Sequence, residues 1–513
     1  MSLQSATAAS GPAEDVPPRF DWLRVGLFAL MAVGAAFRIR QFVFNRSLWL
    51  DEAVLSQNIV NRGPWELISQ PLDYGQQAPF GFLLLLKALV ATLGPTDIAL
   101  RVWPFAAAIA SLWFAYLLAR RALSSAAGQL ILVGLVSFSP LLIYYSNEVK
   151  QYGTDVAVAI GLMWIALGFE HWKHGPAVLV TAGLLAPWFS NSAQFVIAGL
   201  WLALIPHWRR RGRMGWWWLV GAAWFTSIAV TFGLTLLVRG IPTGLIDYWQ
   251  LGFAPFPPLS AADLRWYADS FLGLVYMPLR ELRVPPIPAR PEWTGALNLV
   301  MAGLGLLGTW AMFRRRRRLF VVAGSSVLLT LAASALELYP FRSRLVLFLA
   351  PVTFLALAFA GEWLSSLRPA WLGAVLGLAA TLGTLSVAFV PAARMFDNPP
   401  NRADMKGALE YISTHREPGD GIVINTTSYP AFQFYAADYG LTEDDLSAMI
   451  DRDDDEELRL ESVLAAGPGR YWMFITHVDL DLAETVESWG DSITVEDQWS
   501  NGGVSGLVID VPR

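Results

Sequence analysis

Three acidic residues stand where two apolar stretches of the chain end, and their positions point to proton-transfer chemistry. Asp51 and Glu52 are adjacent in residues 45–53 (NRSLWLDEA), and Glu148 lies in residues 144–152 (YYSNEVKQY). Charge at the end of a membrane helix is costly and is therefore usually functional. If both ends face the same side of the membrane, the carboxylates converge on one cavity. A partly buried carboxylate there can take the proton of a hydroxyl group.

The adjacency of Asp51 and Glu52 gives the two side chains different surroundings. On a helix they point about 100° apart. One can therefore face the cavity as a base while the other binds a cation, orients a neighbour or pairs with Arg46. A purely structural ion pair at the helix end is the alternative interpretation of this motif.

The composition is that of a polytopic membrane protein followed by an acidic soluble domain. Of 513 residues, 55% are hydrophobic and 15% charged, whereas soluble proteins have about 25% charged residues. Residues 394–513 carry 24 acidic and 8 basic residues, a net charge of −16, and the preceding residues carry 18 acidic and 29 basic, a net of +11. We therefore expect a transmembrane α-helical domain over residues 23–393 and an extracytoplasmic α/β domain over residues 394–513. The absence of cysteine fits an oxidising compartment.

Apolar runs of roughly 15–22 residues, near the ~20 that span a bilayer, predict about 11 transmembrane helices. They are residues 25–44, 102–119, 126–144, 155–168, 177–189, 193–205, 216–237, 297–313, 319–336, 345–360 and 371–390. With the N-terminus inside, every strongly basic short loop is cytoplasmic. The five arginines at 314–318 are typical of a topology anchor, so we expect no nucleic-acid partner. We place the protein in the plasma (inner) membrane.

The same topology places residues 41–100, the turn with Glu148 and the C-terminal domain outside. Residues 1–22 are expected to form a disordered cytoplasmic tail, with no signal peptide. The apolar run 80–93 is too short to span the bilayer comfortably and is predicted to lie in its interface. A further outer loop, residues 238–293, is rich in proline and aromatic residues that stack on a sugar or anchor in the headgroups.

The C-terminal domain shows alternating helix and strand signals, which indicate a small α/β fold. An amphipathic helix is predicted at residues 401–414, and buried strands at 421–425, 471–476 and 506–511. The acidic cluster at residues 451–457 lacks the glycine and spaced ligands of a calcium-binding EF-hand loop. We interpret it as a solvated surface.

Segments in the first third of the chain resemble, in order, motifs of the integral-membrane glycosyltransferases of the GT-C fold. The resemblance is to the branch that contains protein O-mannosyltransferases and the aminoarabinose transferase that modifies lipid A. The segments are residues 47–53 (SLWLDEA), 77–85 (QAPFGFLLL), 101–104 (RVWP) leading to 118–121 (LARR), and 139–140 (SP) followed by 144–152. More loosely, residues 339–344 (YPFRSR) resemble the family's Arg-Tyr-Leu-type outer turn.

The resemblance implies an enzyme that moves a hexose or pentose, with inversion, from a polyprenyl-phosphate donor to an acceptor hydroxyl at the outer (periplasmic) membrane face. Asp51 is the expected general base, with Glu52 and Glu148 as further catalytic carboxylates. Asp51 and Glu148 are also the candidate ligands of a divalent cation, Mg²⁺ or Mn²⁺, if one is required. The acceptor is a lipid, a glycan or a protein, and membrane lipids are further partners.

Cationic side chains are expected to stabilise the charge of the departing phosphate. We assign this role to Arg342, Arg344 and Lys150, with snorkelling to the headgroups as the alternative for the two arginines. A tight turn breaks the alternation that would put both arginines on one face, so we expect only one of them to reach the phosphate. Gln77 stands where many relatives have His or Lys, the residue thought to hold the lipid phosphate in the aminoarabinose branch, so this role moves elsewhere or weakens.

Gln77, Tyr145 and Tyr152 are expected to bind substrate. The oligosaccharyltransferase branch of the family is disfavoured because the C-terminal domain has no Trp-Trp-Asp sequence. The alternative function is a transporter or flippase of lipid-linked sugars. It predicts paired internal repeats and ionisable groups in mid-membrane. We find no clear repeat, and nearly all charges cluster at the ends of the apolar runs.

Overall fold

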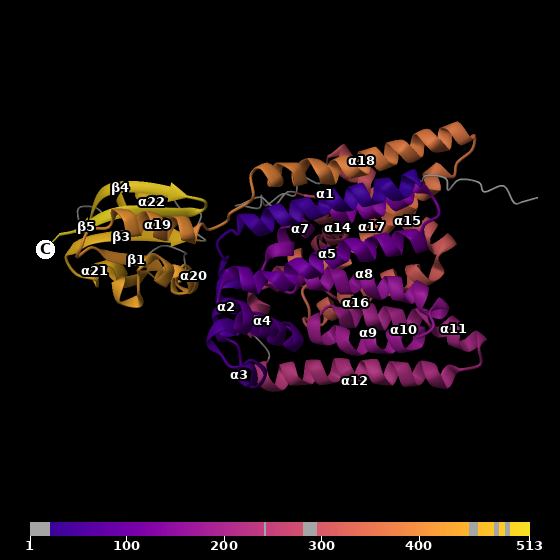
Figure 1. The fold of residues 1–513 in the computed structure, drawn as a ribbon, viewed down its shortest axis with the longest axis horizontal. Helices are drawn as coiled ribbons and strands as arrows, with labels where there is room; N and C mark the ends of the chain where they lie inside the picture. The colour runs from indigo at the N-terminus through magenta and orange to yellow at the C-terminus, as the bar shows by residue number, and fades with distance from the viewer. Residues whose placement is uncertain are drawn as a thin grey trace, which may run out of the picture.

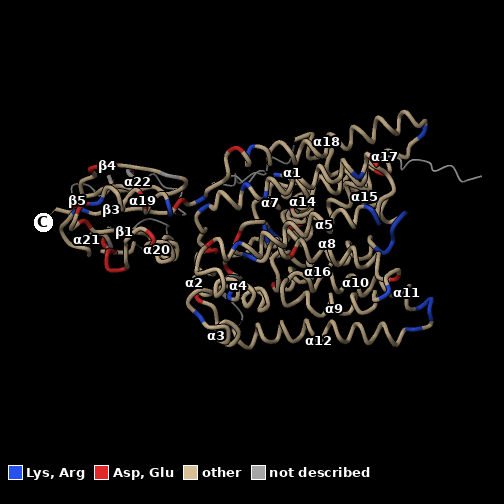
Figure 2. Tube along the Cα trace, viewed as in Figure 1, with Lys and Arg blue, Asp and Glu red and all other residues tan. Residues whose placement is uncertain are grey.

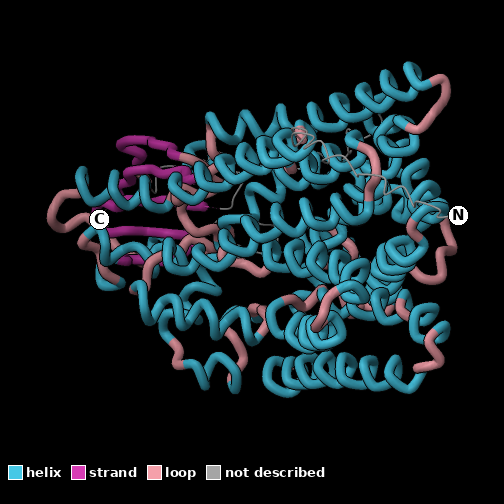
Figure 3. The backbone as a smooth tube through the Cα atoms, turned by 45° about the vertical axis from the view of Figure 1, so that its right-hand side comes forward, coloured by secondary structure: helices cyan, strands magenta, loops and turns pink. Residues whose placement is uncertain are grey.

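The computed structural model describes residues 21–240, 243–280, 295–450, 460–476, 482–487 and 493–512. A bundle of long helices forms most of the molecule, and a small domain with a β-sheet lies at one end (Figures 1 and 3). Within the described residues, eight helices are long and apolar enough to cross a membrane, or nine if a pair bent by 47° is one span. The protein is therefore a multi-pass integral membrane protein, as its composition predicts.

The candidate spans differ in how they are built. Six are single helices: α1 (Trp22–Phe44), α5 (Asp97–Ala122), α12 (Met214–Arg239), α15 (Ala296–Arg315), α16 (Arg317–Ala335) and α18 (Ala370–Asp397). Two combine an α-helix with a 3-10 helix: α8 (Tyr152–Gly168) with η3 (Phe169–His171), and η7 (Ser343–Leu349) with α17 (Ala350–Ser365). The bent pair is α6 (Ala126–Phe138) followed by α7 (Pro140–Tyr144) and η2 (Tyr145–Asn147).

The two predicted spans that fall short are consecutive in the chain. Residues 177–189 and 193–205 correspond to α9 (Gly175–Phe189) and α10 (Ala193–Ala203), of 15 and 11 residues. Both are shorter than the ~20 residues of a full crossing, so the described residues contain eight candidate spans, or nine with the bent pair, rather than the predicted eleven. Because α9 and α10 are consecutive, omitting both leaves an odd number of crossings when the bent pair is counted as one span. The predicted side of every other loop is unchanged.

The bend between α6 and α7 comes from Pro140, which has no N–H to donate to the carbonyl of Val136. The buried guanidinium of Arg38, on α1, takes that place: it donates to the carbonyls of Val136 at 2.8 Å and Ser137 at 3.0 Å. The Asn147 side chain in turn donates to the Arg38 carbonyl at 3.2 Å. These contacts fix the turn that follows, which carries Glu148.

Basic residues gather at the end of the bundle away from the β-sheet domain (Figure 2). The loops after α5, α15 and α17 and the short helix α11 (Ile205–Arg210) all bring arginines to this end. The acidic motif of the first loop lies at the other end. The sequence-based grouping of basic loops on one side therefore matches the arrangement of the helices.

The first loop folds into short helices at the end of the bundle that faces the sheet. They are α2 (Leu50–Asn61), α3 (Pro64–Ser69), η1 (Asp73–Gly75) and α4 (Phe80–Leu93). Helix α4 has the bounds that the sequence predicts, and its single charge, Lys87, donates to the carbonyl of Val60 near the end of α2 at 2.9 Å. The interfacial position of α4 stays a prediction.

The loop predicted at residues 238–293 contains α13 (Thr243–Tyr248), the turn η4 (Gln250–Gly252), α14 (Ala261–Tyr276) and η5 (Met277–Leu279), and its residues 241–242 and 281–293 lie outside the described part. The Gly252 carbonyl accepts a hydrogen bond from the Phe341 amide at 2.8 Å. The loop is thereby attached to the turn that carries Arg342 and Arg344.

The C-terminal domain is a five-stranded sheet with helices, ordered β2-β1-β3-β5-β4. The first three strands are parallel and the last two pair antiparallel. Its elements are α19 (Met405–His415), β1 (Gly421–Asn425), α20 (Tyr429–Tyr435), β2 (Leu446–Ile450), α21 (Leu460–Leu464), β3 (Gly469–Thr476), α22 (Leu482–Glu487), β4 (Thr494–Asn501) and β5 (Val504–Val511).

The sequence predicts this α/β class and three of the strands. Strands β2 and β4 were not predicted. Helix α19 begins after its predicted start because the Asp404 side chain caps it, accepting from the Gly407 amide at 3.2 Å. The acidic cluster at residues 451–457 and the tail up to residue 20 lie outside the described residues.

The C-terminal domain is packed against the first loop through a shared apolar core. Leu48 and Leu55 of the loop region belong to the same buried cluster as Leu409 and Phe432 of the domain. Figure 1 shows α20 beside α2 at this junction. The end of the bundle that carries the acidic motif is thus covered by the C-terminal domain.

Candidate active site

Helix α2 and the turn before α8 bring the three acidic residues of the motifs to one end of the bundle. Asp51 and Glu52 occupy the first turn of α2, where carboxylates are favoured by the helix dipole. Glu148 follows η2 directly. The two motifs are joined by a hydrogen bond from the Val149 amide to Glu52, at 2.8 Å. The structure therefore brings the two motifs together.

Glu52 is completely buried and fully engaged. One carboxylate oxygen accepts from the Val149 amide and, at 3.3 Å, from Arg101. The other accepts from the Trp49 amide at 3.2 Å and lies 3.8 Å from the guanidinium of Arg46. Both oxygens are taken by protein groups, so this carboxylate holds the first loop, α5 and the Glu148 turn together.

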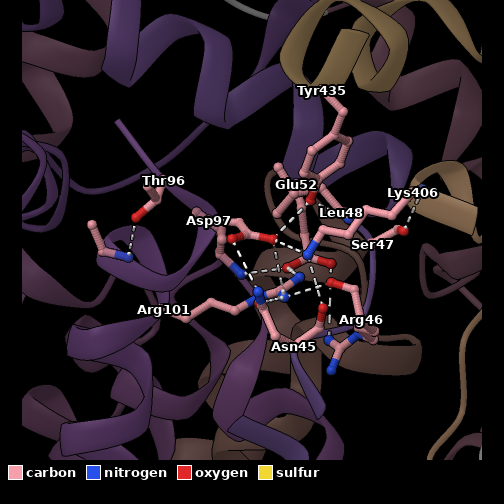
Figure 4. A network of polar contacts seen from close by, with 12 residues as sticks. Asn45, Arg46, Ser47, Leu48, Glu52, Thr96, Asp97, Arg101, Lys406 and Tyr435 are labelled. Atoms are coloured by element: carbon pink, nitrogen blue, oxygen red, sulfur yellow. Dashed lines mark hydrogen bonds and ion pairs between the residues drawn. The ribbon is translucent and has the colours of Figure 1, made fainter. Parts of the chain in front are cut away.

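The Glu52 cluster continues into a network that includes the C-terminal domain (Figure 4). Arg101 also donates to the Asn45 side chain at 2.7 Å. Asp97 accepts from Lys406 at 2.5 Å and from the Tyr435 hydroxyl at 3.0 Å. Burial, and then the nearby Asp97 carboxylate, raise the pKa of Tyr435 well above its usual value. Tyr435 therefore stays a neutral donor, and the domain is joined to the bundle by buried polar contacts.

Asp51 points away from this network to a more open position. Its carboxylate pairs with Arg344, and the Arg344 Nε donates to the Tyr152 hydroxyl at 3.1 Å. The Asp51 and Arg344 side chains keep 25% and 16% of their surface exposed. The indole of Trp249 lies 5.7 Å from the guanidinium. A carboxylate and a guanidinium thus meet at a partly exposed position, with the buried phenol of Tyr152 hydrogen-bonded to the guanidinium.

Glu148 lies deeper and is incompletely paired. Its Oε2 is 3.9 Å from Arg46 and has no hydrogen-bond partner among the described residues. The Arg46 guanidinium stacks at 4.0 Å on the ring of Tyr144, and its three nitrogens likewise lack hydrogen-bond partners in the described part of the chain. Burial, and then the charge of Glu52, raise the pKa of Glu148 to about 7 against the opposing effect of Arg344. This carboxyl group can change its charge near neutral pH.

The other residues assigned from the sequence surround this site to different degrees. Lys150 is buried, which lowers its pKa, and it donates to the Gln76 side chain at 2.5 Å, next to Gln77. Tyr145 packs edge-on against Tyr152, with ring centres 5.2 Å apart. Arg342, by contrast, is exposed, and its β-carbon faces Gly252.

The backbone of the outer turn explains why the two arginines differ. Ser343 between them has a φ of 53°, in the left-handed region. This breaks the alternation of side chains, so Arg344 faces Asp51 and Arg342 faces outward. The prediction that a tight turn separates the two arginines agrees with this geometry.

Sequence reasoning missed four residues in the segments around the site, three of them cationic and one a tyrosine. Arg402, from the C-terminal domain, stacks on Trp49 at 3.8 Å and lowers the pKa of Glu148. Arg239, at the end of α12, donates to the Ala78 carbonyl at 2.5 Å, and its Nε and one terminal nitrogen have no partner among the described residues. The other two are Lys406 and Tyr435. A usable signal existed for Arg402 and Lys406, because basic residues in the acidic domain concentrate at its start.

The candidate metal ligands do not form a cation site in this arrangement. Among the described residues there is no group of three His, Asp or Glu side chains that could hold a metal ion. Asp51 pairs with one arginine and Glu148 lies beside another. In this arrangement the two carboxylates do not fit a divalent cation.

No protein-family model matches the chain, and no curated protein sequence does. Three solved structures are similar over most of it. ArnT from Cupriavidus metallidurans bound to undecaprenyl phosphate is 10% identical, with 95% of this chain and 98% of that chain covered and a TM-score of 0.48. The Archaeoglobus fulgidus oligosaccharyltransferase in complex with Zn and sulfate is 14% identical, with 79% and 61% covered and a TM-score of 0.45.

The third structure is the archaeal oligosaccharyltransferase AglB from Archaeoglobus fulgidus, in complex with an inhibitory peptide and a dolichol-phosphate. It is 12% identical, with 95% of this chain and 74% of that chain covered and a TM-score of 0.52. This likeness shows the fold alone. The chain has a GT-C-like fold, a many-span helical membrane protein with a C-terminal α/β domain, and the fold predicted from the motifs is confirmed.

Proposed function

We propose that the protein is an inverting glycosyltransferase that moves a sugar from a polyprenyl-phosphate donor to an acceptor hydroxyl, with Asp51 as general base. The observation that carries the proposal is the partly open cluster of Asp51, Arg344 and Tyr152 beside the incompletely paired Glu148. The similar structure of AglB was solved with a dolichol-phosphate, which supports a polyprenyl-phosphate donor for this chain as well.

In this proposal the donor phosphate takes the place of Asp51 at Arg344. A bidentate guanidinium contact with phosphate is at least as favourable as one with a carboxylate. Asp51, released from its ion pair, then accepts the proton of the acceptor hydroxyl. The acceptor oxygen bonds to the anomeric carbon from the face opposite the phosphate, and the sugar–phosphate bond breaks with its electron pair on the phosphate. The product is a glycoside of inverted configuration and a free polyprenyl phosphate.

The remaining cations share the second negative charge that the phosphate gains as it leaves. Arg46 and Lys150 are buried near Glu148 and Asp51, and Arg402 is close enough to influence the pKa of Glu148. Preorganised charges of this kind stabilise a departing anion without reorganisation. Glu148 positions the acceptor hydroxyl. We keep Gln77, Tyr145 and Tyr152 as the groups that hold the sugar.

The proposal places the site and the C-terminal domain outside the plasma membrane. It rests on the separation of the basic loops from this end of the bundle (Figure 2). Ser500 is exposed on β4, and the chain has no cysteine. A Ser500→Cys variant should therefore react with an impermeant thiol reagent in intact cells. Reaction only after permeabilisation would reverse the orientation and remove the proposed site.

The activity test is transfer of label from radiolabelled polyprenyl-phosphate sugars to membrane fractions by the purified protein. We expect a labelled product of the acceptor and release of polyprenyl phosphate, and we expect both to be lost in Asp51→Asn. The same assay with and without EDTA tests the predicted divalent cation. Movement of the lipid-linked sugar across vesicles without any transfer would instead assign the transporter function.

A further inference from the structure

A polar cavity of about 500 Å³ lies between helix α2 and helix α20 of the C-terminal domain. This volume is within the ~300–1,000 Å³ typical of sites for small ligands. The side chains that give it its chemistry are four amides, two phenols and a carboxylate: Gln57, Asn58, Asn61, Gln433, Tyr74, Tyr429 and Asp73. None of the site assignments made above includes this cavity.

The cavity opens on the face of α2 that carries Asp51. Val54, Asn58 and Asn61 line it, and they follow Asp51 by three, seven and ten residues. This spacing places all four on one side of a helix. The far end, at Asn61, is about 15 Å along the helix from Asp51, at a rise of ~1.5 Å per residue. A ligand held in the cavity can therefore present its end to the proposed base.

The chemistry of the lining selects an uncharged, hydroxyl-rich ligand. Amides and carboxylates donate to and accept from sugar hydroxyls, and a phenol ring stacks on the apolar face of a sugar. Among the described residues that line the cavity there is no Lys or Arg. Arg62, which is close by, is already paired with Asp73 at 2.5 Å and with the Pro71 carbonyl. The lining therefore offers no cation for a phosphate or another anion.

Contacts within the protein hold these polar groups in place. Gln433 and Tyr429 both donate to Glu443, at 2.7 and 3.0 Å, and Asn61 donates to Gln57 at 2.8 Å. Tyr74 has a φ of 56°, in the region that residues other than glycine rarely adopt; the residue is 66% exposed and lines the cavity. Strain of this kind is maintained where the surrounding structure requires it and is characteristic of ligand sites.

We propose that this cavity binds the acceptor, and that the acceptor is an uncharged glycan chain whose terminal sugar receives the transferred unit at Asp51. The inference rests on the proposed glycosyltransferase function and names its substrate class. The C-terminal domain contributes one wall of the cavity through α20, which gives that domain a role in selecting the acceptor.

The test measures binding of mannotriose, maltotriose and arabinotriose to the purified full-length protein, in a detergent without a sugar headgroup. Calorimetry or saturation-transfer NMR reports binding without any donor. Tyr74→Gly removes the ring and relieves the backbone, and Gln433→Ala removes an amide from the other wall. Trp65→Ala is the matched control, because Trp65 is an exposed aromatic residue of the same loop that does not line the cavity.

We expect at least one trisaccharide to bind saturably. Each cavity variant should weaken that binding by about 3- to 10-fold, the loss of one stacking contact or one hydrogen bond, while Trp65→Ala keeps the parental affinity. If the parent binds a trisaccharide but transfers no sugar, the proposed reaction is refuted and the glycan site is still supported.

Two results would overturn the cavity proposal while the transfer assay remains positive. One is the absence of binding by all three trisaccharides, or equal binding by parent and cavity variants. The other is saturable binding of a Ser/Thr-containing octapeptide where none of the sugars binds, which would assign the cavity to a polypeptide acceptor.

Discussion

Asp51 and Glu52 are neighbours on one helix and carry the same charge, yet the structure uses them in opposite ways. Glu52 is fully buried, with both oxygens occupied by Arg101 and backbone amides and with Arg46 nearby. Asp51 is a quarter exposed and pairs with Arg344 across the site. A fully buried carboxylate with protein partners on both oxygens is out of reach of a substrate, whereas a partly exposed one can be reached.

The contrast separates structural from chemical charge within a single motif. A buried ion cluster with every oxygen satisfied contributes to one specific arrangement of the chain and loses much when one member is removed. A partly exposed carboxylate that pairs with a cation across the site can give up that cation to a ligand. Substitutions at the two positions should therefore fail in different ways.

The largest effect is expected at Asp51. Asp51→Asn keeps the volume and removes the base, and a positioned general base contributes about 10²–10⁴-fold. Transfer should fall by that factor or more, with an unchanged melting temperature in detergent. Steady-state transfer and thermal unfolding measured on the same preparation check this. Near-normal turnover in Asp51→Asn together with a dead Glu148→Gln would exchange the roles of the two residues.

Glu52→Gln should damage the fold rather than the chemistry alone. The change leaves Arg101 and Arg46 buried without their carboxylate, and removing one partner of a buried pair costs about 3–5 kcal/mol. We expect poor membrane yield and a clearly lower melting temperature than in Asp51→Asn. A Glu52→Gln protein that is as stable as the parent but inactive would make Glu52 a chemical residue and cancel the contrast.

Arg344 and Arg342 lie in a single turn and differ in the same way as Asp51 and Glu52: only one of them is expected to contact the substrate. The expected effect on activity is smaller than at Asp51. Arg344 contacts Asp51 and Tyr152, whereas Arg342 faces outward. Losing a charge-assisted contact to phosphate costs about 1.5–3 kcal/mol, so Arg344→Ala should weaken use of the donor by roughly 10- to 150-fold. Arg342→Ala is the control and should be nearly neutral. Donor titrations that show the reverse order, or no change in either variant, would place the phosphate elsewhere, at Lys150 or Arg239.

Local patterns in the sequence were enough for much of the fold. The bounds of α4, three strands of the sheet and the meeting of the two acidic motifs follow from apolar runs and motif positions. The two predicted spans at α9 and α10 are too short to cross the membrane on their own. Apolar composition indicates a buried helix but does not determine whether the helix is long enough to cross.

The missed parts of the site depend on contacts between distant segments. Lys406 and Asp97, joined at 2.5 Å, are 309 residues apart in the chain, and nothing in either local sequence indicates the other. The choice between Asp51 and Glu52 depends on where α2 begins, and helix starts are uncertain by a residue or two from sequence. That uncertainty amounts to a rotation of the helix by about 100° per residue, which exchanges the two side chains.

The smallest expected effect concerns Glu148, which lies between the saturated and the open carboxylate in its surroundings. Its pKa, raised by burial and by Glu52 to about 7, makes it neutral below that pH and anionic above it. The anionic form competes with the donor phosphate for Arg46, Arg344 and Arg402, which oppose the rise in its pKa. The phosphodiester of the donor does not itself titrate near neutral pH. The donor KM should therefore rise by about 3- to 10-fold from roughly pH 6 to pH 8, a loss of ~0.6–1.4 kcal/mol in donor binding.

Glu148→Gln tests this assignment because the amide is neutral at every pH. The variant should keep the low donor KM across the range, whereas Arg342→Ala, which leaves the carboxyl unchanged, should retain the parental pH dependence. Donor titrations at several pH values for the three proteins provide the comparison. A parental KM that stays flat, or a slope that persists in Glu148→Gln, would show that Glu148 does not share its cations with the phosphate. Glu148 would then have no part in donor binding, and only its proposed contact with the acceptor hydroxyl would remain.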